Sequence, residues 1–263
     1  RQSGNLAAAY GVAVTATMAI TTTLFSVQAR ERWRWPLLGV VAFAIFFLCI
    51  DLSFFSANIV KIAQGGWFPL AVGLVIYTLM STWRLGRQIL NQRLASQMMS
   101  FDDFLRDLPH IPRVAGTAIF MTRSTEGIPT TLLHNLKHNK VVHQKVVILT
   151  VETEETSHLS PEERYEWADL GNGVYRLVLR FGFMEDVALP EMLTSLKDSP
   201  VTFSPMTTSY FLGRETLIPT RHPGMAIWRE HLFAWMVRNA TSASHFFGLP
   251  PNQVIELGAQ VEI

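Results

Sequence analysis

Three apolar stretches decide the fold of this chain: LAAAYGVAVTATMAITTTLFSV at residues 6–27, WPLLGVVAFAIFFLCIDLSFF at 35–55 and WFPLAVGLVIYTLMSTW at 67–83. The first and third carry no charged residue, and the second carries only Asp51. A bilayer core about 30 Å thick is spanned by roughly 20 helical residues, and each stretch is in or near that range. Lipid offers the backbone no hydrogen-bond partner, so a spanning segment of this kind must be helical. The sequence therefore predicts an integral membrane protein with transmembrane helices at about residues 5–27, 35–56 and 67–84.

The rest of the chain has a different composition. Glu31 and Asp51 are the only acidic residues before Arg84, and all eight histidines lie at or after His110. Roughly 165 residues follow the membrane part, which is enough for one globular domain with its own core. We therefore expect a transmembrane region at residues 1–94 and a water-facing domain at residues 95–263.

The charges of the loops predict the orientation of the spans. The loop between the first two spans is basic, with Arg30, Arg32 and Arg34. The second loop contains Lys61 as its single basic residue, and basic residues again follow the third span: Arg84, Arg87 and Arg93. Short loops rich in Lys and Arg stay on the cytoplasmic side. We therefore expect the first and third spans to run from outside to inside, which makes the C-terminal domain cytoplasmic.

The first predicted span carries a row of small residues. Gly4, Ala8, Gly11 and Thr15 recur at helical spacing. Small residues let two helices approach closely in lipid, and this packing is their general use in membrane helices. Hydroxyl and carbonyl groups on such a face would also fit a cation path, whereas threonines that bond to their own helix carbonyls indicate packing alone. The sequence leaves both interpretations open.

Asp51 is the only ionisable residue inside a predicted span. Charged residues at such positions are costly and are candidates for ion or proton pathways. It lies about 24 Å beyond Trp35 along the helix at 1.5 Å per residue, near the outer end of the bilayer core. At that depth the carboxylate can also be partly hydrated, or paired with Lys61 or with a helix from elsewhere in the protein. A transport role and a packing role are therefore both open.

The C-terminal domain alternates between strand-like and helical patterns. Strands are expected at residues 117–122, 145–152, 173–182, 209–212 and 254–257, and helices at 95–109, 129–139, 190–197 and 225–240. This order predicts an α/β domain, in which ligands often bind at the carboxyl ends of the strands. Gly171-Asn172-Gly173 fits a hairpin turn better than a phosphate-binding loop.

No catalytic motif stands out in this domain. It contains neither G-x-x-x-x-G-K-[ST] nor G-x-G-x-x-G, so regulatory nucleotide binding is a hypothesis from fold class alone. His134, His138 and nearby His143 have a spacing that can bind Zn²⁺, but the adjacent lysines favour a solvated basic face. The glutamates between residues 152 and 166 are interpreted as solvated charge around a loop. We expect no enzymatic activity, no cofactor and no metal.

Composition excludes two further classes. The net charge of +1, without clustered basic residues, gives no reason to expect a nucleic-acid partner. Cys49 is the single cysteine, so an internal disulfide framework is impossible.

Because three helices are few for a permease, and the small-residue face needs helices to pack against, we expect the chain to be the C-terminal piece of a longer membrane protein.

Three motifs resemble the KUP/HAK/KT family of potassium uptake permeases. They are AYGVAVTATMAITTT at residues 9–23, IDLSFFSANIVKIAQGGWFPL at 50–70 and FFGLPPNQVIELGAQVEI at 246–263. The first two are similar to the tenth and eleventh transmembrane helices of the family, with the entry to the twelfth, and the third is similar to the C-terminus of its bacterial members. The resemblance extends over essentially the whole chain and identifies it as the C-terminal portion of such a permease.

The resemblance implies a proton-coupled potassium symporter of the bacterial inner membrane, with an inverted-repeat transporter fold and a cytoplasmic C-terminal domain. K⁺ and H⁺ would be the transported species, the rest of the permease chain and membrane lipid the partners, and a homodimer is plausible by analogy. The family's ion sites are ascribed chiefly to helices of the N-terminal part, so this chain alone should not transport. The residues carried over as transport candidates are Tyr10, Thr15, Asp51 and Asn58. The rival hypothesis is a membrane-anchored cytoplasmic sensor, in which the three helices only tether a ligand-binding domain.

Overall fold

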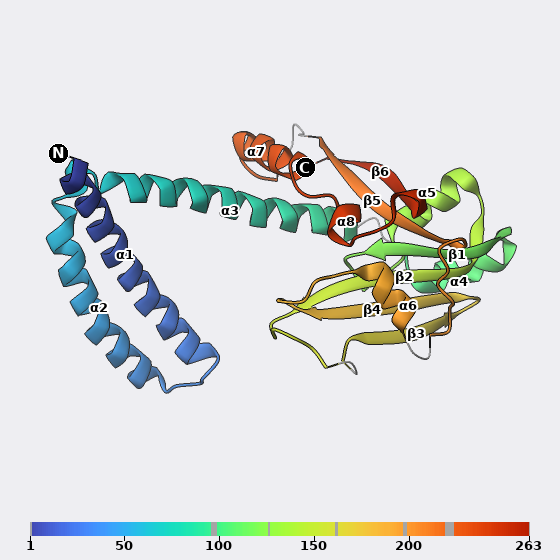
Figure 1. Ribbon diagram of the computed structural model, residues 1–263, viewed down its shortest axis with the longest axis horizontal. Helices are drawn as coiled ribbons and strands as arrows, with labels where there is room; N and C mark the ends of the chain where they lie inside the picture. The colour runs from blue at the N-terminus through green and yellow to red at the C-terminus, as the bar shows by residue number, and fades with distance from the viewer. Residues whose placement is uncertain are drawn as a thin grey trace. The chain divides into compact units, whose positions relative to one another are not determined.

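The chain forms two compact units, Arg1–Ser81 and Thr82–Ile263, each described here by itself (Figure 1). The computed structural model describes residues 2–95, 99–125, 127–160, 163–196, 199–218 and 224–262. Among the residues singled out from the sequence, Glu162, Lys197 and the terminal Ile263 lie outside these ranges.

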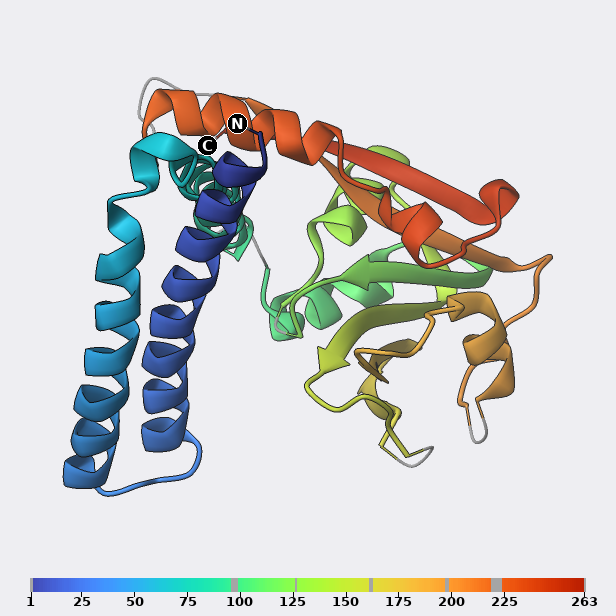
Figure 2. The ribbon, with the colours of Figure 1, turned by 60° about the vertical axis from the view of Figure 1, so that its left-hand side comes forward.

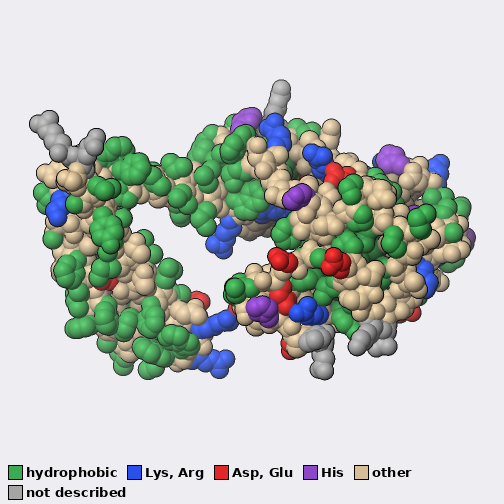
Figure 3. Space-filling model, in the orientation of Figure 1, with side chains coloured by type: hydrophobic (Ala, Val, Ile, Leu, Met, Phe, Trp, Pro, Cys, Tyr) green, Lys and Arg blue, Asp and Glu red, His purple; other side chains and the backbone are tan. Residues whose placement is uncertain are grey.

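The first unit is helical. Its elements are α1 (Gln2–Glu31), α2 (Leu37–Ile59), the short 3₁₀ helix η1 (Ile62–Gln64) and the start of α3 (Trp67–Ala95), which continues into the second unit. Helices α1 and α2 run antiparallel beside each other (Figure 2). Three segments, Ser3–Glu31, Leu37–Ile59 and Trp67–Ala95, are long and apolar enough to cross a membrane, which confirms the three predicted spans. Their outer surfaces carry exposed apolar side chains (Figure 3).

The second unit contains a six-stranded mixed sheet in the order β3-β4-β2-β1-β5-β6. The strands are β1 (Arg113–Thr122), β2 (Val142–Glu154), β3 (Tyr165–Gly171), β4 (Val174–Gly182), β5 (Thr208–Ile218) and β6 (Val254–Glu262). Only the β3–β4 pair is antiparallel; the other four neighbouring pairs are parallel. The remaining elements are α4 (Phe101–Asp107), η2 (Leu108–His110), α5 (Thr130–Asn139), α6 (Leu189–Ser195), α7 (Ile227–Arg238), α8 (Ala243–Phe246) and η3 (Pro251–Gln253). The predicted α/β class is therefore confirmed.

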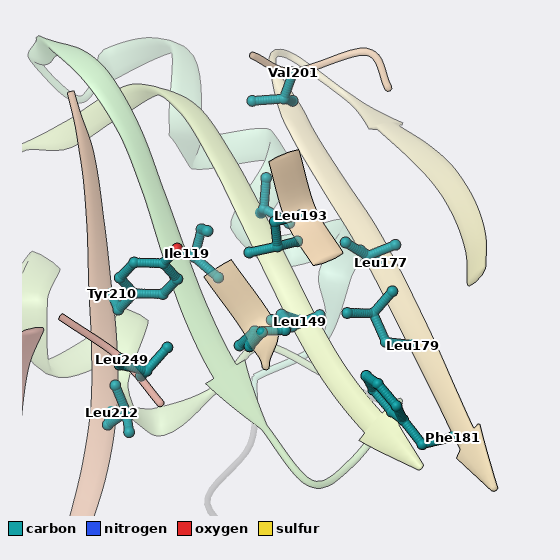
Figure 4. Packing of buried hydrophobic residues seen from close by; sticks show 12 residues of the cluster. Ile119, Leu149, Leu177, Leu179, Phe181, Leu193, Val201, Tyr210, Leu212 and Leu249 are labelled. Atoms are coloured by element: carbon teal, nitrogen blue, oxygen red, sulfur yellow. The ribbon is translucent and has the colours of Figure 1, made fainter. Parts of the chain in front are cut away.

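Core side chains alternate between the two faces of the sheet. On β1, Ile119 points to one face, whereas Ala118 and Phe120 point to the other. The first face packs against Leu189 and Leu193 of α6 (Figure 4), and the second face packs against α4 and α5. Because the central strands are covered on both sides, they read as continuous apolar runs such as VVILT at residues 146–150.

Several predicted boundaries were wrong. Strand β3 was not predicted, because the glutamates around it were interpreted as solvated charge in a loop. Glu166 lies on β3 and Glu152 on β2, and both carboxylates pair with Arg180 on β4, at 2.8 and 3.3 Å. Strands β5 and β6 extend well past the predicted residues, since each is paired with the other along its length. The expected helix at 95–109 is shorter: α3 reaches Ala95, residues 96–98 are not described, and α4 covers Phe101–Asp107.

The hairpin between β3 and β4 depends on left-handed backbone conformations. Asn172 and Gly173 form its two-residue loop with φ values of 51° and 73°, which confirms the predicted turn. Gly173 also has no room for a side chain, because an added Cβ would lie 2.6 Å from the Gln144 carbonyl oxygen on β2. The turn therefore tolerates only glycine at this position.

We expect Gly173→Ala to lower the free energy of unfolding of the C-terminal domain by more than about 1–2 kcal/mol, the cost of a left-handed non-glycine residue alone. Gly248→Ala is the matched control, because its φ is 61° but an added Cβ would meet nothing within 4 Å. Thermal unfolding of the purified chain in detergent measures both losses. Equal losses would contradict the close approach to Gln144.

A second prediction concerns the carboxylate of Glu185, just after β4. The Gly182 amide donates to its Oε2 at 2.8 Å and Arg164 pairs with its Oε1. The hydrogen bond from Gly182, with the charge of Arg164, lowers the pKa of Glu185 below its ordinary value of 4.5. A lowered folded-state pKa stabilises the fold above the unfolded-state pKa and loses that contribution as the pH falls. We therefore expect Glu185→Gln to destabilise the domain at pH 7, with a deficit that shrinks as the pH falls below about 4.5.

Chemical denaturation between pH 7 and pH 3 measures this difference. Glu191→Gln, at an exposed position on α6, serves as the control and should show no such trend. A deficit for Glu185→Gln that stays constant with pH would show that the carboxylate's charge does not stabilise the fold.

Candidate functional site

Asp51 is buried against the neighbouring helix. Its side chain on α2 is 4% exposed, and its Oδ2 accepts a hydrogen bond of 2.6 Å from the Thr22 hydroxyl on α1. A hydrogen bond to a buried carboxylate is stronger than one between neutral groups, and it removes much of the cost of burial. The bond between Thr22 and Asp51 therefore joins α1 and α2 at a buried carboxylate.

Lys61 does not pair with Asp51, in contrast to one of the alternatives considered from the sequence. Its Nζ donates instead to Asn58 Oδ1 at 3.1 Å, and Asn58 Nδ2 donates to the Phe54 carbonyl oxygen. Asn58 in turn lies against Gly11 of α1, where an added Cβ would be 2.8 Å from Asn58 Oδ1. The small residue at position 11 thus makes room for Asn58, and this contact positions the end of α2 beside α1.

The turn before α3 packs against α1 in a similar way. Gly65 has φ 130°, and an added Cβ would lie 2.7 Å from the Asn5 carbonyl oxygen. At Gly66 an added Cβ would lie 2.6 Å from a methyl group of Val12. Both glycines therefore allow a close approach that any side chain would prevent.

Thr15 and Tyr10 have different environments from Asp51. The Thr15 hydroxyl donates to the Gly11 carbonyl oxygen of its own helix at 2.8 Å, which is the arrangement expected of a packing residue. Tyr10 is 73% exposed on the surface of this unit. Thr17 and Thr23 also bond to carbonyls of their own helix. Thr22 is the threonine of α1 whose hydroxyl bonds across to α2.

A hollow of about 540 Å³ lies along these two helices beside Asp51. Its lining is mostly apolar and comes from both helices: Tyr10, Ala13, Val14, Thr17, Met18, Thr21, Thr22, Phe47 and Asp51. The structure thus brings Tyr10 and Asp51 to one surface, whereas Thr15 and Asn58 are not among the lining residues. Sequence analysis missed Thr22, although the three consecutive threonines at 21–23 were a signal that Asp51 had hydroxyl donors within reach.

A second hollow, of about 890 Å³, lies in the C-terminal unit at the carboxyl end of β1 and beside the middle of β5. Ligands of α/β sheets often bind at the carboxyl ends of strands. The polar lining of this hollow includes Arg123, Ser124 and Glu215, and the Thr131 hydroxyl beside it is buried without a hydrogen-bond partner. Regulatory nucleotide binding stays a prediction for this unit. Calorimetry that detects no binding of adenine nucleotides would remove it.

The three histidines considered for Zn²⁺ do not come together. The rings of His134 and His138 on α5 lie 6.2 Å apart, whereas His143 lies on β2 with its ring 5.9 Å from that of Phe211. Burial lowers the pKa of His143 below its ordinary value of 6.5. In the described part of the chain, no group of three or more His, Cys, Asp or Glu residues is placed to hold a metal ion.

We expect Thr22→Val to destabilise the helical unit by about 1–3 kcal/mol, because it leaves the buried Asp51 carboxylate without its donor. Thr23→Val is the matched control, since the exposed Thr23 hydroxyl bonds only to its own helix. The double variant Thr22→Val/Asp51→Val should recover part of the loss, because both polar partners are then absent. Thermal unfolding in detergent measures the stability of each variant. Equal losses for Thr22→Val and the control Thr23→Val would show that the Thr22–Asp51 bond contributes nothing.

Sequence models of two domains match the chain, and together they cover most of it. The model described as "K+ potassium transporter integral membrane domain" matches residues 1–88. The model described as "K+ potassium transporter C-terminal domain" matches residues 115–263. These two regions contain the helical unit and the sheet, respectively.

Curated relatives match along the whole chain. A protein of Myxococcus xanthus (strain DK1622) named "Probable potassium transport system protein Kup" is 52% identical over 100% of this chain and 41% of its own length. A protein of the same name from Erythrobacter litoralis (strain HTCC2594) is 47% identical over 100% of this chain and 42% of its own length. The chain therefore spans less than half the length of these relatives. With both of its domains matched by the models, and with the resemblance seen in its sequence confirmed, the chain belongs to the K+ potassium transporter family.

Proposed function

We propose that this chain is the C-terminal part of a proton-coupled potassium permease of the bacterial inner membrane. The proposal rests on the family to which the chain belongs and on the names of its relatives, which describe probable potassium transport system proteins. The observation that carries it to particular residues is the buried Asp51 carboxylate, held by Thr22 beside a hollow on the helical unit. Transport by this protein involves no covalent catalysis.

The hollow beside Asp51 supports the proposal that further helices of the same permease pack against this surface. An apolar concave face that also carries a carboxylate is poorly suited to lipid alone, because lipid offers no partner to a charge. A neighbouring helix can fill the concave surface and bring its own donors to Asp51. In this proposal α1–α3 complete the bundle whose remaining helices contribute the principal ion sites, and homodimerisation remains a prediction.

The loop between α1 and α2 supports a cytoplasmic location for this end of the helices. Arg30, in the last turn of α1, donates to the Trp35 carbonyl oxygen in this loop at 2.9 Å, and the ring of Trp33 lies 6.3 Å from that of Trp35. Tryptophans favour the headgroup layer, and short basic loops remain on the cytoplasmic side. The same rule makes the C-terminal domain, which follows the basic end of α3, cytoplasmic.

Asp51 is proposed to couple movement of the helices to ion or proton passage. A carboxylate can only accept from Thr22, whereas a carboxylic acid can both accept and donate, so a proton passing through this site would add a donor between α1 and α2. Such a change provides two discrete arrangements at one helix contact, which is what coupling between sites requires. The rival hypothesis, a membrane-anchored sensor, gives Asp51 a packing role only.

Growth at low millimolar potassium of a bacterium deficient in potassium uptake tests the proposed activity. We expect the full-length parent protein to rescue growth, and this chain alone to fail, because the principal ion sites are proposed to lie outside it. Failure of both proteins, with each inserted in the membrane, would favour the anchored-sensor hypothesis.

We expect Asp51→Asn in the full-length protein to lower potassium uptake by about an order of magnitude, since coupling between sites is typically worth about 1–3 kcal/mol. Asparagine keeps the size of the side chain and cannot take up a proton. Ser53→Ala on the same helix is the control, because the exposed Ser53 hydroxyl bonds only to Cys49 of its own helix. Uptake of labelled rubidium at matched levels of inserted protein is the measurement, and unchanged uptake in Asp51→Asn would assign Asp51 to the scaffold.

A further inference from the structure

Helix α7 of the second unit packs against the final part of α3. Arg229 Nε donates to the Thr82 hydroxyl at 2.9 Å, and the ring of Phe233 lies against Gly86, where an added Cβ would be 2.5 Å from the ring. The ring of Trp83 meets that of Phe233 edge to face, with the centroids 5.7 Å apart. Gly86 therefore lets α7 approach α3 closely, and the contact includes a polar bond as well as aromatic packing.

The contact lies close to residue 84, where the third span is predicted to end. Counted from Trp67 at 1.5 Å per residue, Thr82 is about 22 Å and Ile89 about 33 Å along α3. A bilayer core about 30 Å thick that begins at Trp67 would therefore end between these two residues. Ile89 also takes part, since an added Cβ at Gly224 before α7 would lie 2.9 Å from its Cδ1. Trp83 and Arg84, at the start of this stretch, are residue types that favour the headgroup layer. A helix attached to α3 at these residues is therefore at the depth of that layer.

One face of α7 is buried, whereas the opposite face is exposed and carries two tryptophans. Glu230, Phe233 and Ala234 are buried on the inner face, and Glu230 is the only acidic residue of the helix. The outer face consists of five exposed residues: Ile227, Trp228, His231, Trp235 and Arg238. The last four recur at three- and four-residue spacing, as residues on one face of a helix do. Trp228 and Trp235 are 58% and 57% exposed. We call this set the tryptophan face.

We propose that α7 lies in the headgroup layer of the membrane, with the tryptophan face seated among phospholipids. An indole ring is apolar with a polar N–H, so it is suited to the boundary between acyl chains and headgroups. The face carries Arg238 and no acidic side chain, which complements the anionic lipids of a membrane surface. The contact between α7 and α3 holds the helix at this depth, so that its exposed tryptophans are covered without a protein partner.

The proposal concerns the position of α7 and does not depend on transport activity. An environment-sensitive nitrobenzoxadiazole label at His231→Cys tests it, because this position lies between Trp228 and Trp235 and leaves both in place. Cys49→Ser first removes the single native cysteine. The labelled chain is reconstituted in vesicles of phosphatidylcholine and phosphatidylglycerol, with or without bromine on the acyl chains as a quencher.

Two further label positions make the result decisive. Phe46→Cys, 62% exposed near the middle of α2, reports insertion, and Met206→Cys, 92% exposed on the C-terminal unit, reports water. We expect the label at position 231 to emit at shorter wavelength than the label at 206 and to lose intensity with brominated lipid. A label at 231 that behaves like the label at 206, while the label at 46 is quenched, would overturn the proposal.

Removal of the aromatic anchors tests the cause. We expect Trp228→Ala/Trp235→Ala to reduce the quenching at position 231, whereas Phe183→Ala/Met184→Ala, which removes two exposed apolar side chains elsewhere on the C-terminal unit, should leave it unchanged. A label at 231 that is shielded from water only at high protein concentration, and is not quenched by brominated lipid, would show that a second copy of the chain covers the tryptophan face, and would also overturn the proposal.

Discussion

A lipid bilayer offers no hydrogen bonds to a polypeptide, and the structure of the helical unit follows from how the chain meets that constraint. The backbone of each span meets it by forming a helix. The buried Asp51 carboxylate meets it through the hydroxyl of Thr22 on the adjacent helix. The bond therefore satisfies a buried polar group and joins two helices at the same point.

The contacts around Asp51 depend on glycines as much as on polar groups. Gly11 leaves space for Asn58, and Gly65 and Gly66 let the turn before α3 approach α1. In lipid, helices associate mainly through close packing, so these positions decide which faces meet. Once those faces are fixed, Thr22 lies opposite Asp51. The helix packing thus positions the polar pair beside the hollow that runs along α1 and α2.

Sequence reasoning predicted the features that depend on composition and local pattern. The three spans, the α/β domain and the turn at Asn172-Gly173 follow from apolar length, alternation of elements and turn chemistry. It missed strand β3, where Glu166 is explained by its ion pair with Arg180 on a neighbouring strand. It also missed the pairing of Asp51 with Thr22, because the rotation of two helices about their axes depends on packing between residues distant in sequence. The same dependence on packing explains why the sequence could not decide whether Lys61 pairs with Asp51 or, as the structure has it, bonds to Asn58.

The central proposal is that this chain is part of a permease that moves protons together with potassium. Proteoliposomes of the full-length protein, loaded with a pH-sensitive dye and given an inward potassium gradient, test it directly. The account predicts that the interior becomes more acidic, because protons enter together with potassium. Potassium entering alone would make the interior positive and drive protons outward. An interior that becomes more alkaline, or that does not change in pH while potassium enters, would contradict the account.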